Sequence, residues 1–458
     1  MSFVKAFCRF LDRISFADLS QGETATVKNA FRDGIGCILA GSVEEPARIV
    51  YSLLPKIWGP GDAVVIGTRL TAPATAAAFA NGVAGHCLDY DDLNQPMMGH
   101  PTAVLVPAIL ATAAVVSVSG QEAIVSYAVG LELAAKLGRG LNPYHYEQGW
   151  HATSTLGTLA AAASAAKLLR LSPQETSWAL GIAASEASGL RRNFGSMAKA
   201  FHAGHAARCG LTAALLAREG FSSCEDILEG PGGLFSVLAP RPVTEIPPLE
   251  QALGAPLELT ASGLSVKQYP CCAASHPVLD LVLSLRKEWG ARLPRLRRIV
   301  CRVHPQVPHI MIHDIPKTPL EGKFSLRYCV ATAMIDGAVT LESFSPDAMK
   351  REGLEHWWAS IVVRPDLDGR DSCYGGIPTR AEVIFEWDDG TSTSACLERP
   401  RGTPEDPLPE EVLEKKFEEC ARRALPEGTL GSVQGKLRAL EALPALGELS
   451  RDLVPPLP

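Results

Sequence analysis

The stretch His86–Pro101, which reads HCLDYDDLNQPMMGHP, is the segment around which the rest of the chain is expected to fold. It places two histidines and three carboxylates between two alanine-rich apolar segments, residues 73–84 and 103–114. Burying a carboxylate costs roughly several kcal/mol unless hydrogen bonds or cations replace its water. The stretch is therefore either solvated or a site, and a polar segment between two buried helices usually lines a pocket.

The composition is typical of a globular protein of two or three domains. The chain has 458 residues, 47% of them hydrophobic, and a formal charge of −7, which argues against nucleic-acid binding. We find no apolar run of about twenty residues, and so expect no membrane span. Twelve scattered cysteines without zinc-site spacing indicate reduced thiols, and the charged N-terminal segment does not resemble a secretory signal. We therefore expect a cytoplasmic protein.

Helical periodicity dominates up to about residue 232, which predicts a mainly α protein. The sequence Ser172-Pro173-Gln174-Glu175 has the form of a capping box and predicts a helix that begins at residue 173. The expected helices cover residues 3–14, 23–41, 46–54, 72–83, 103–118, 122–137, 153–169, 173–188, 200–218, 276–289 and 409–424.

The pattern changes beyond Gly232, where prolines become frequent. Residues 296–303, 380–387 and 391–398 are rich in β-forming residues, and the Asp-Asp-Gly sequence at 388–390 is a hairpin signal. These strands predict a small α+β domain over residues 267–398. The proline-rich tail from residue 443 is expected to be poorly ordered.

Three polar segments stand at the entrances of predicted buried helices: residues 86–101, 138–151 and 191–199. A helix entrance presents backbone N–H groups and the positive end of the helix dipole, which suit a carboxylate or another anion. The histidines and the lysine nearest to these entrances are His100, His151 and Lys199.

Several motifs, in order along nearly the whole chain, resemble those of the MmgE/PrpD family. They are LDYDD at 88–92, GHP at 99–101, GWHATS at 149–154, NFGSMAK at 193–199, HAGHAAR at 202–208, KQYPC at 267–271 and KFSLRY at 323–328. Members of this family include 2-methylcitrate dehydratase, cis-aconitate decarboxylase and iminodisuccinate epimerase. The resemblance implies a large all-helical domain, residues 1–266 completed by 399–458, and a smaller α+β lid domain, residues 267–398. It also implies a homodimer whose site needs no metal or other cofactor and takes a small di- or tricarboxylate.

The reactions of this family require a proton to leave or join a carbon next to a carboxylate. This chemistry needs a base poised near neutral pH and cations that stabilise the enediolate, and histidine and lysine supply both. We therefore predict catalytic roles for His100, His151, Lys199 and Asp89, with Asp89 orienting a histidine or touching the substrate.

Four further residues are predicted to bind the substrate. Lys267 and Tyr328 would close over it from the lid, while Arg191 and Arg192 lie in a loop that would set specificity. For Tyr328 the alternative is plain core packing. The two histidines likewise have the alternative of being helix-start residues, and Lys199 that of a surface lysine.

Other polar residues near the motifs are given supporting roles. Asp91 and Asp92 fit helix or loop caps. His202 and His205 lack an acidic third metal ligand at suitable spacing and are predicted to be structural or to support the site. Cys271 is given no nucleophilic role, because no adjacent histidine would activate it.

Three functions remain open on the sequence alone. The first is a lyase that acts as a dehydratase or decarboxylase, and the second is an epimerase with two opposed acid–base groups. The third is a non-catalytic binding homologue, against which the joint presence of His100, His151 and Lys199 argues. Leu93 stands where decarboxylase-like members have threonine, and it argues against decarboxylation.

Overall fold

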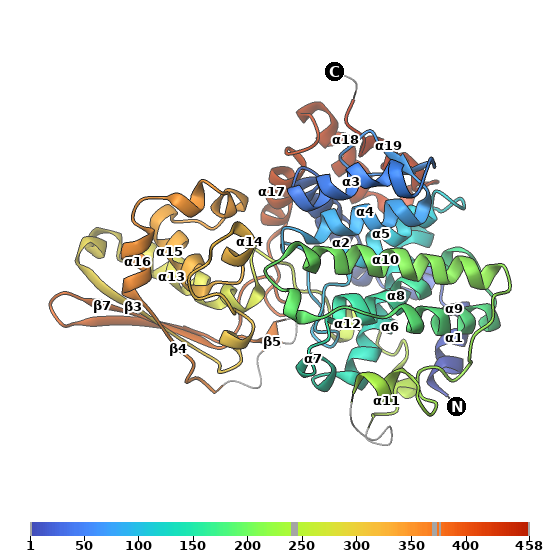
Figure 1. Ribbon diagram of the computed structural model, residues 1–458, viewed down its shortest axis with the longest axis horizontal. Helices are drawn as coiled ribbons and strands as arrows, with labels where there is room; N and C mark the ends of the chain where they lie inside the picture. Colours follow the sequence, from blue (N-terminus) through green and yellow to red (C-terminus); the bar gives the residue numbers. More distant parts are fainter. Residues whose placement is uncertain (1, 240–245, 369–372, 375–376, 457–458) are drawn as a thin grey trace.

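The computed structural model describes residues 2–239, 246–368, 373–374 and 377–456. A large helical body and a smaller body built on a sheet lie next to each other, and the first and last helices of the chain belong to the same large body (Figure 1). The helices of the large body are α1 (Phe3–Arg13), α2 (Gln21–Gly41), α3 (Glu45–Ile57), α4 (Ala74–His86), α5 (Thr102–Thr112), α6 (Gly120–Leu141), α7 (Tyr144–Glu147), α8 (Ala152–Leu168), α9 (Pro173–Glu186), α10 (Met197–Arg218), α11 (Leu234–Leu238), α12 (Glu258–Ala261), α17 (Glu410–Ala421), α18 (Glu427–Arg438) and α19 (Gly447–Asp452).

Small side chains allow the central helices α4, α8 and α10 to pack closely, and α10 lies against both of the others. A Cβ atom added at Gly82 of α4 would lie 2.7 Å from the Cα atom of Gly204 in α10. The predicted start of α9 is confirmed: the Ser172 hydroxyl accepts the Glu175 N–H, and the Glu175 carboxylate accepts the Ser172 N–H. The predicted mainly α fold is thus the observed one.

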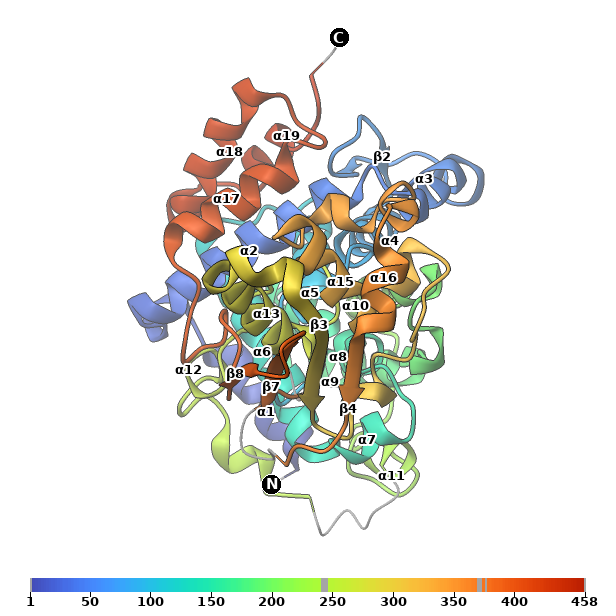
Figure 2. The same cartoon turned by 90° about the vertical axis from the view of Figure 1, so that its left-hand side faces the viewer.

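The smaller body is a four-stranded sheet of order β4-β3-β7-β8, covered by helices on one face (Figures 1 and 2). The three predicted strands are confirmed, but the parallel strand β4 was not predicted because it has only four residues. The strands are β3 (Leu296–Val303), β4 (Ile361–Arg364), β7 (Ala381–Trp387) and β8 (Ser392–Leu397), and the helices are α13 (His276–Glu288), α14 (Pro319–Gly322), α15 (Leu326–Asp336) and α16 (Leu354–Ser360). Short two-stranded pairs are β1 (Ala63–Val64) with β2 (Thr71–Ala72) and β5 (Cys373–Tyr374) with β6 (Ile377–Pro378).

Buried apolar side chains form two large cores. One contains residues up to Leu264 and again from Phe417 onward, whereas the other contains residues 269–387 together with Leu93. On this basis we propose the domain division into 1–266 with 399–458, and 267–398.

The C-terminal segment contradicts the prediction of a poorly ordered tail from residue 443. Helix α19 and the residues that flank it place Leu446, Leu449 and Leu453 in the large core with no exposed surface. These leucines outweigh the prolines because burying each contributes roughly 2 kcal/mol.

Within the described ranges, no helix is both long and apolar enough to cross a bilayer. The eleven cysteines with described side chains are free thiols.

Candidate active site

A cavity at the junction of the two bodies brings together five of the eight predicted site residues. About 390 Å³ in and around this cavity is free of protein atoms when its open side is included, and about 30 Å³ of it can hold the centre of a water molecule. Two larger cavities lie beside α1 and contain none of the predicted residues. The side chains that line the junction cavity are Asp89, Leu93, Met98, His100, Tyr146, His151, Phe194, Lys199, Lys267, Cys272, Ala273, Ile310 and Phe324.

Asp89 joins the two predicted lysines. Its Oδ1 atom lies 2.7 Å from Nζ of Lys199 on α10 and 2.7 Å from Nζ of Lys267 on the lid side, and Lys267 also donates to the Asp89 carbonyl oxygen at 2.8 Å. Burial alone would raise the pKa of Asp89, but the two ammonium groups outweigh it and hold the pKa well below its usual range. Asp89 therefore does not orient a histidine: its contact with Nε2 of His100 is 3.9 Å long.

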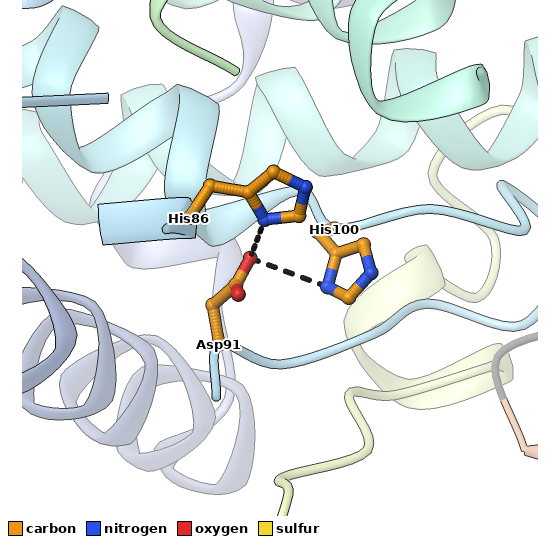
Figure 3. A group of neighbouring side chains, drawn as sticks. All are labelled: His86, Asp91 and His100. Carbon is orange, nitrogen blue, oxygen red and sulfur yellow. Dashed lines mark hydrogen bonds and ion pairs between the residues drawn. The ribbon is translucent and has the colours of Figure 1, made fainter. Parts of the chain in front are cut away.

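Asp91 makes the contacts to histidine that were expected of Asp89. Its Oδ2 atom accepts a hydrogen bond from Nδ1 of His86 at 2.8 Å and lies 3.2 Å from Nδ1 of His100, as Figure 3 shows. Burial lowers the pKa of His100 and lowers that of His86 to about 3, so both rings are neutral at pH 7 despite the carboxylate. The predicted capping role of Asp91 is wrong, whereas Asp92 accepts the N–H of Thr102 at the start of α5, as predicted.

The side chains of His86, Asp91 and His100 are close enough to share a metal ion, because their ligand atoms lie within 4.8 Å of one another. Imidazole nitrogen and carboxylate oxygen are suitable ligands for a divalent ion. In the structure these atoms contact each other directly, so an ion would have to displace the proton between His86 and Asp91 (Figure 3).

His151 contacts a second histidine. It precedes α8, lines the cavity, and has its Nδ1 atom 2.9 Å from Nδ1 of His202 on α10. One ring must donate and the other accept in this hydrogen bond. Burial lowers the pKa of both, that of His202 to about 4. His202 thus contacts His151 without lining the cavity itself. His205 hydrogen bonds the Ser188 hydroxyl and is not among the cavity residues either.

Three predicted substrate-binding residues do not line the cavity. Tyr328 is fully buried in the lid core, where its hydroxyl donates to the Ser343 carbonyl oxygen at 2.6 Å, so the alternative of core packing is the observed one. Arg191 lies over the Tyr146 ring, 3.7 Å from its centroid, and donates to the Tyr146 carbonyl. Arg192 is exposed.

Lys323 is a buried cation to which no role was assigned, although it lies in the quoted KFSLRY motif. Its Nζ atom donates to the carbonyl oxygens of Leu88, at 2.8 Å, and of Pro270, at 2.7 Å. It therefore ties the polar segment after α4 to the lid. Burial lowers the pKa of Lys323 to about 8, although the charge of Asp89 opposes this shift.

The fold and the cavity define a class of protein: a mainly helical, two-domain protein with a buried lysine, histidine and aspartate site at the domain junction. More particularly, the chain belongs to the MmgE/PrpD family. The N-terminal domain of that family matches residues 5–246 and its C-terminal domain matches residues 269–431.

Curated relatives match almost the whole chain. A cis-aconitate decarboxylase-like protein of Aspergillus oryzae is 26% identical over 96% of this chain and 95% of its own length. The cis-aconitate decarboxylase of Aspergillus terreus is 25% identical over 95% of this chain and 92% of its own length. That of Homo sapiens is 27% identical over 100% of this chain and 95% of its own.

Proposed function

We propose that the protein is a cofactor-independent lyase that acts on a small di- or tricarboxylic acid through a carbanion next to a carboxylate. The observation that carries this proposal is the pair of lysines, Lys199 and Lys267, held on one oxygen of Asp89 in a buried cavity that also contains His100 and His151. Cations in a site of low dielectric stabilise negative charge that develops on a substrate far better than cations in water.

Substrate binding would use the donors that Asp89 leaves free. An ammonium group has three N–H donors, and among the described residues Lys199 Nζ makes one hydrogen bond, to Asp89. A substrate carboxylate could therefore bind beside Asp89 without breaking that ion pair. Phe194 and Phe324, each with its ring centroid 5.3 Å from Lys199 Nζ, would exclude water around the bound carboxylate.

The carbanion can form in two ways. In a decarboxylation the bond to a carboxylate breaks, CO₂ leaves and the electron pair remains on the chain; in a dehydration a base removes the proton and hydroxide leaves from the neighbouring carbon. Either anion is delocalised into the adjacent carboxylate as an enediolate, which the lysines stabilise. His100 and His151 would move the protons. The names of the relatives favour decarboxylation.

An epimerase is the second candidate. Two separate acid–base groups, His100 and His151, line the cavity, as epimerisation at one carbon requires, and Leu93 offers no hydroxyl group to the substrate. A protein that only binds its ligand is the third candidate.

Proton NMR in D₂O with citrate, 2-methylcitrate, cis-aconitate and iminodisuccinate separates these candidates. A lyase gives a product with new vinyl signals, which Lys199→Ala abolishes and Lys415→Ala, at a side chain that is 77% exposed, does not. Loss of the α-proton signal without a new compound identifies an epimerase. No reaction and no thermal shift with any acid would refute both catalytic proposals.

We also propose that the protein is a cytoplasmic homodimer. Four exposed apolar side chains on or beside α10 support a contact between subunits: Leu190, Phe201, Leu216 and Phe221. Light scattering coupled to gel filtration would measure the mass of the particle.

Activity that survives dialysis against a chelator would support the absence of a metal cofactor.

A further inference from the structure

We propose that Asp91 is the positioning carboxylate that makes His100 the proton acceptor of the cavity, with His86 as its second donor. This inference rests on the proposed function, because it assigns a role within the same site. It concerns a residue that does not itself line the cavity.

The contacts of Asp91 fix which nitrogen of each ring carries the proton. Nδ1 of His86 and Nδ1 of His100 both approach the same Oδ2 atom, at 2.8 and 3.2 Å (Figure 3). At 2.8 Å two lone pairs would repel, so Nδ1 of His86 carries a hydrogen and donates it to Asp91. Nδ1 of His100 is buried and does not meet hydrogen-bond geometry in the resting structure, but Oδ2 of Asp91 at 3.2 Å is the acceptor within reach, and we assign a hydrogen to this Nδ1 as well. A neutral imidazole has one N–H only, and Nε2 of each ring is therefore unprotonated.

The free nitrogen of His100 is on the side of the ring opposite to Asp91. His100 lines the cavity, and its Nε2 atom lies 3.9 Å from Oδ1 of Asp89, the oxygen on which Lys199 and Lys267 converge. A substrate carboxylate held by these lysines would therefore bring its adjacent carbon close to an unprotonated nitrogen.

This geometry allows a balanced proton transfer in the dehydration and epimerisation routes, in which a C–H bond next to the carboxylate breaks. The substrate C–H bond breaks, its proton joins Nε2 of His100, and its electron pair forms the enediolate beside the lysines. His100 becomes an imidazolium ion, whose charge Asp91 compensates through the Nδ1–H contact. The second donor, His86, keeps the carboxylate in place and ionised, so that Asp91 does not take the proton itself.

Asp92 provides a matched comparison, since it is an equally buried carboxylate next in the chain. It contacts hydroxyl groups instead of histidines: its Oδ2 atom lies 2.5 Å from the Thr102 hydroxyl, which in turn contacts that of Tyr127. Burial raises the pKa of Asp92 well above its usual range and favours its neutral form, so asparagine is a close substitute.

The test is long-range ¹⁵N–¹H NMR of the resting full-length protein labelled in histidine, with the His100 signals identified by their loss in His100→Gln. The proposal expects protonated Nδ1 and unprotonated Nε2 for His100. A proton on Nε2 instead would overturn it, whatever the substrate is, so that this result is separate from failure of the proposed lyase activity.

Two variants extend the test to turnover. Asp91→Ala removes the acceptor and should shift the His100 proton to Nε2 and lower kcat about 100-fold or more. Asp91→Asn keeps an acceptor oxygen but loses the charge, so the tautomer should persist while kcat falls about tenfold, with KM changed less than about threefold. Asp92→Asn should retain the kcat of the unmodified protein. An equal kcat for Asp91→Asn and Asp92→Asn would overturn the proposal.

Discussion

Asp89 and Asp91 are two buried carboxylates two residues apart, and they are kept ionised in different ways. Asp89 is paired with two lysines, whereas Asp91 is held by two neutral histidines. At Asp89 the charges of the two lysines outweigh burial, whereas at Asp91 the electrostatic attraction of the two histidine rings, and then their hydrogen bonds, hold the pKa well below its usual range. The comparison teaches that one short polar segment can support both an anion-binding half and a proton-transfer half of a single cavity.

The largest expected effect is on turnover and concerns the anion-binding half of the cavity. Lys199→Ala removes one of the two cations beside the developing enediolate and should lower kcat/KM by about 1,000-fold. Steady-state kinetics with the acid identified by NMR would measure the loss. An effect no larger than that of the exposed Lys415→Ala would separate Asp89 and its lysines from catalysis.

The next effect is on stability and tests whether Asp89 depends on both cations. Lys267→Met leaves the carboxylate with Lys199 alone and should lower the free energy of unfolding by about 3 kcal/mol, since breaking a buried ion pair leaves uncompensated charge. Urea titration measures it. The double variant Asp89→Asn/Lys267→Met should recover part of the loss, and additive losses would contradict the pairing.

A smaller effect is expected behind the second proton-transfer histidine. His202→Phe removes the hydrogen-bond partner of His151 and should lower kcat about tenfold, because an unpaired buried polar group costs about 1–3 kcal/mol. His202→Asn, which can still accept from Nδ1 of His151, should lose less. Equal losses for the two variants would argue that only the shape of His202 matters.

The smallest expected effect, counted per pH unit, is on the free energy of unfolding at acidic pH. Burial lowers the pKa of His86 to about 3 and that of His145 to about 3, against 6.5 for an exposed ring. The unfolded chain then binds more protons below pH 6.5, so each histidine should cost about 1.4 kcal/mol of stability per pH unit as the pH falls. His145→Gln should reduce that slope in urea titrations at pH 4 to 7, and an unchanged slope would contradict its burial in the neutral form.

The sequence alone predicted helices α1–α6, α8–α10, α13 and α17, because apolar periodicity and caps are local properties. The capping box at Ser172, the alanine-rich helices around the polar segments and the hairpin at residues 388–390 needed no distant contact to be predicted. The same holds for the choice of His100, His151 and the lysines, since the motifs that carry them are short and contiguous.

Only the tertiary structure decided which groups meet. Asp89 and Lys199 are 110 residues apart in the chain, and Asp89 and Lys267 are 178 apart, so no local pattern distinguishes Asp89 from Asp91 as the partner of the lysines. Packing likewise placed the side chain of Tyr328 inside the lid core, buried the leucines at α19 and added β4 to the sheet. These outcomes depend on burial and pairing between distant segments, where the free energy of the whole fold outweighs local preference.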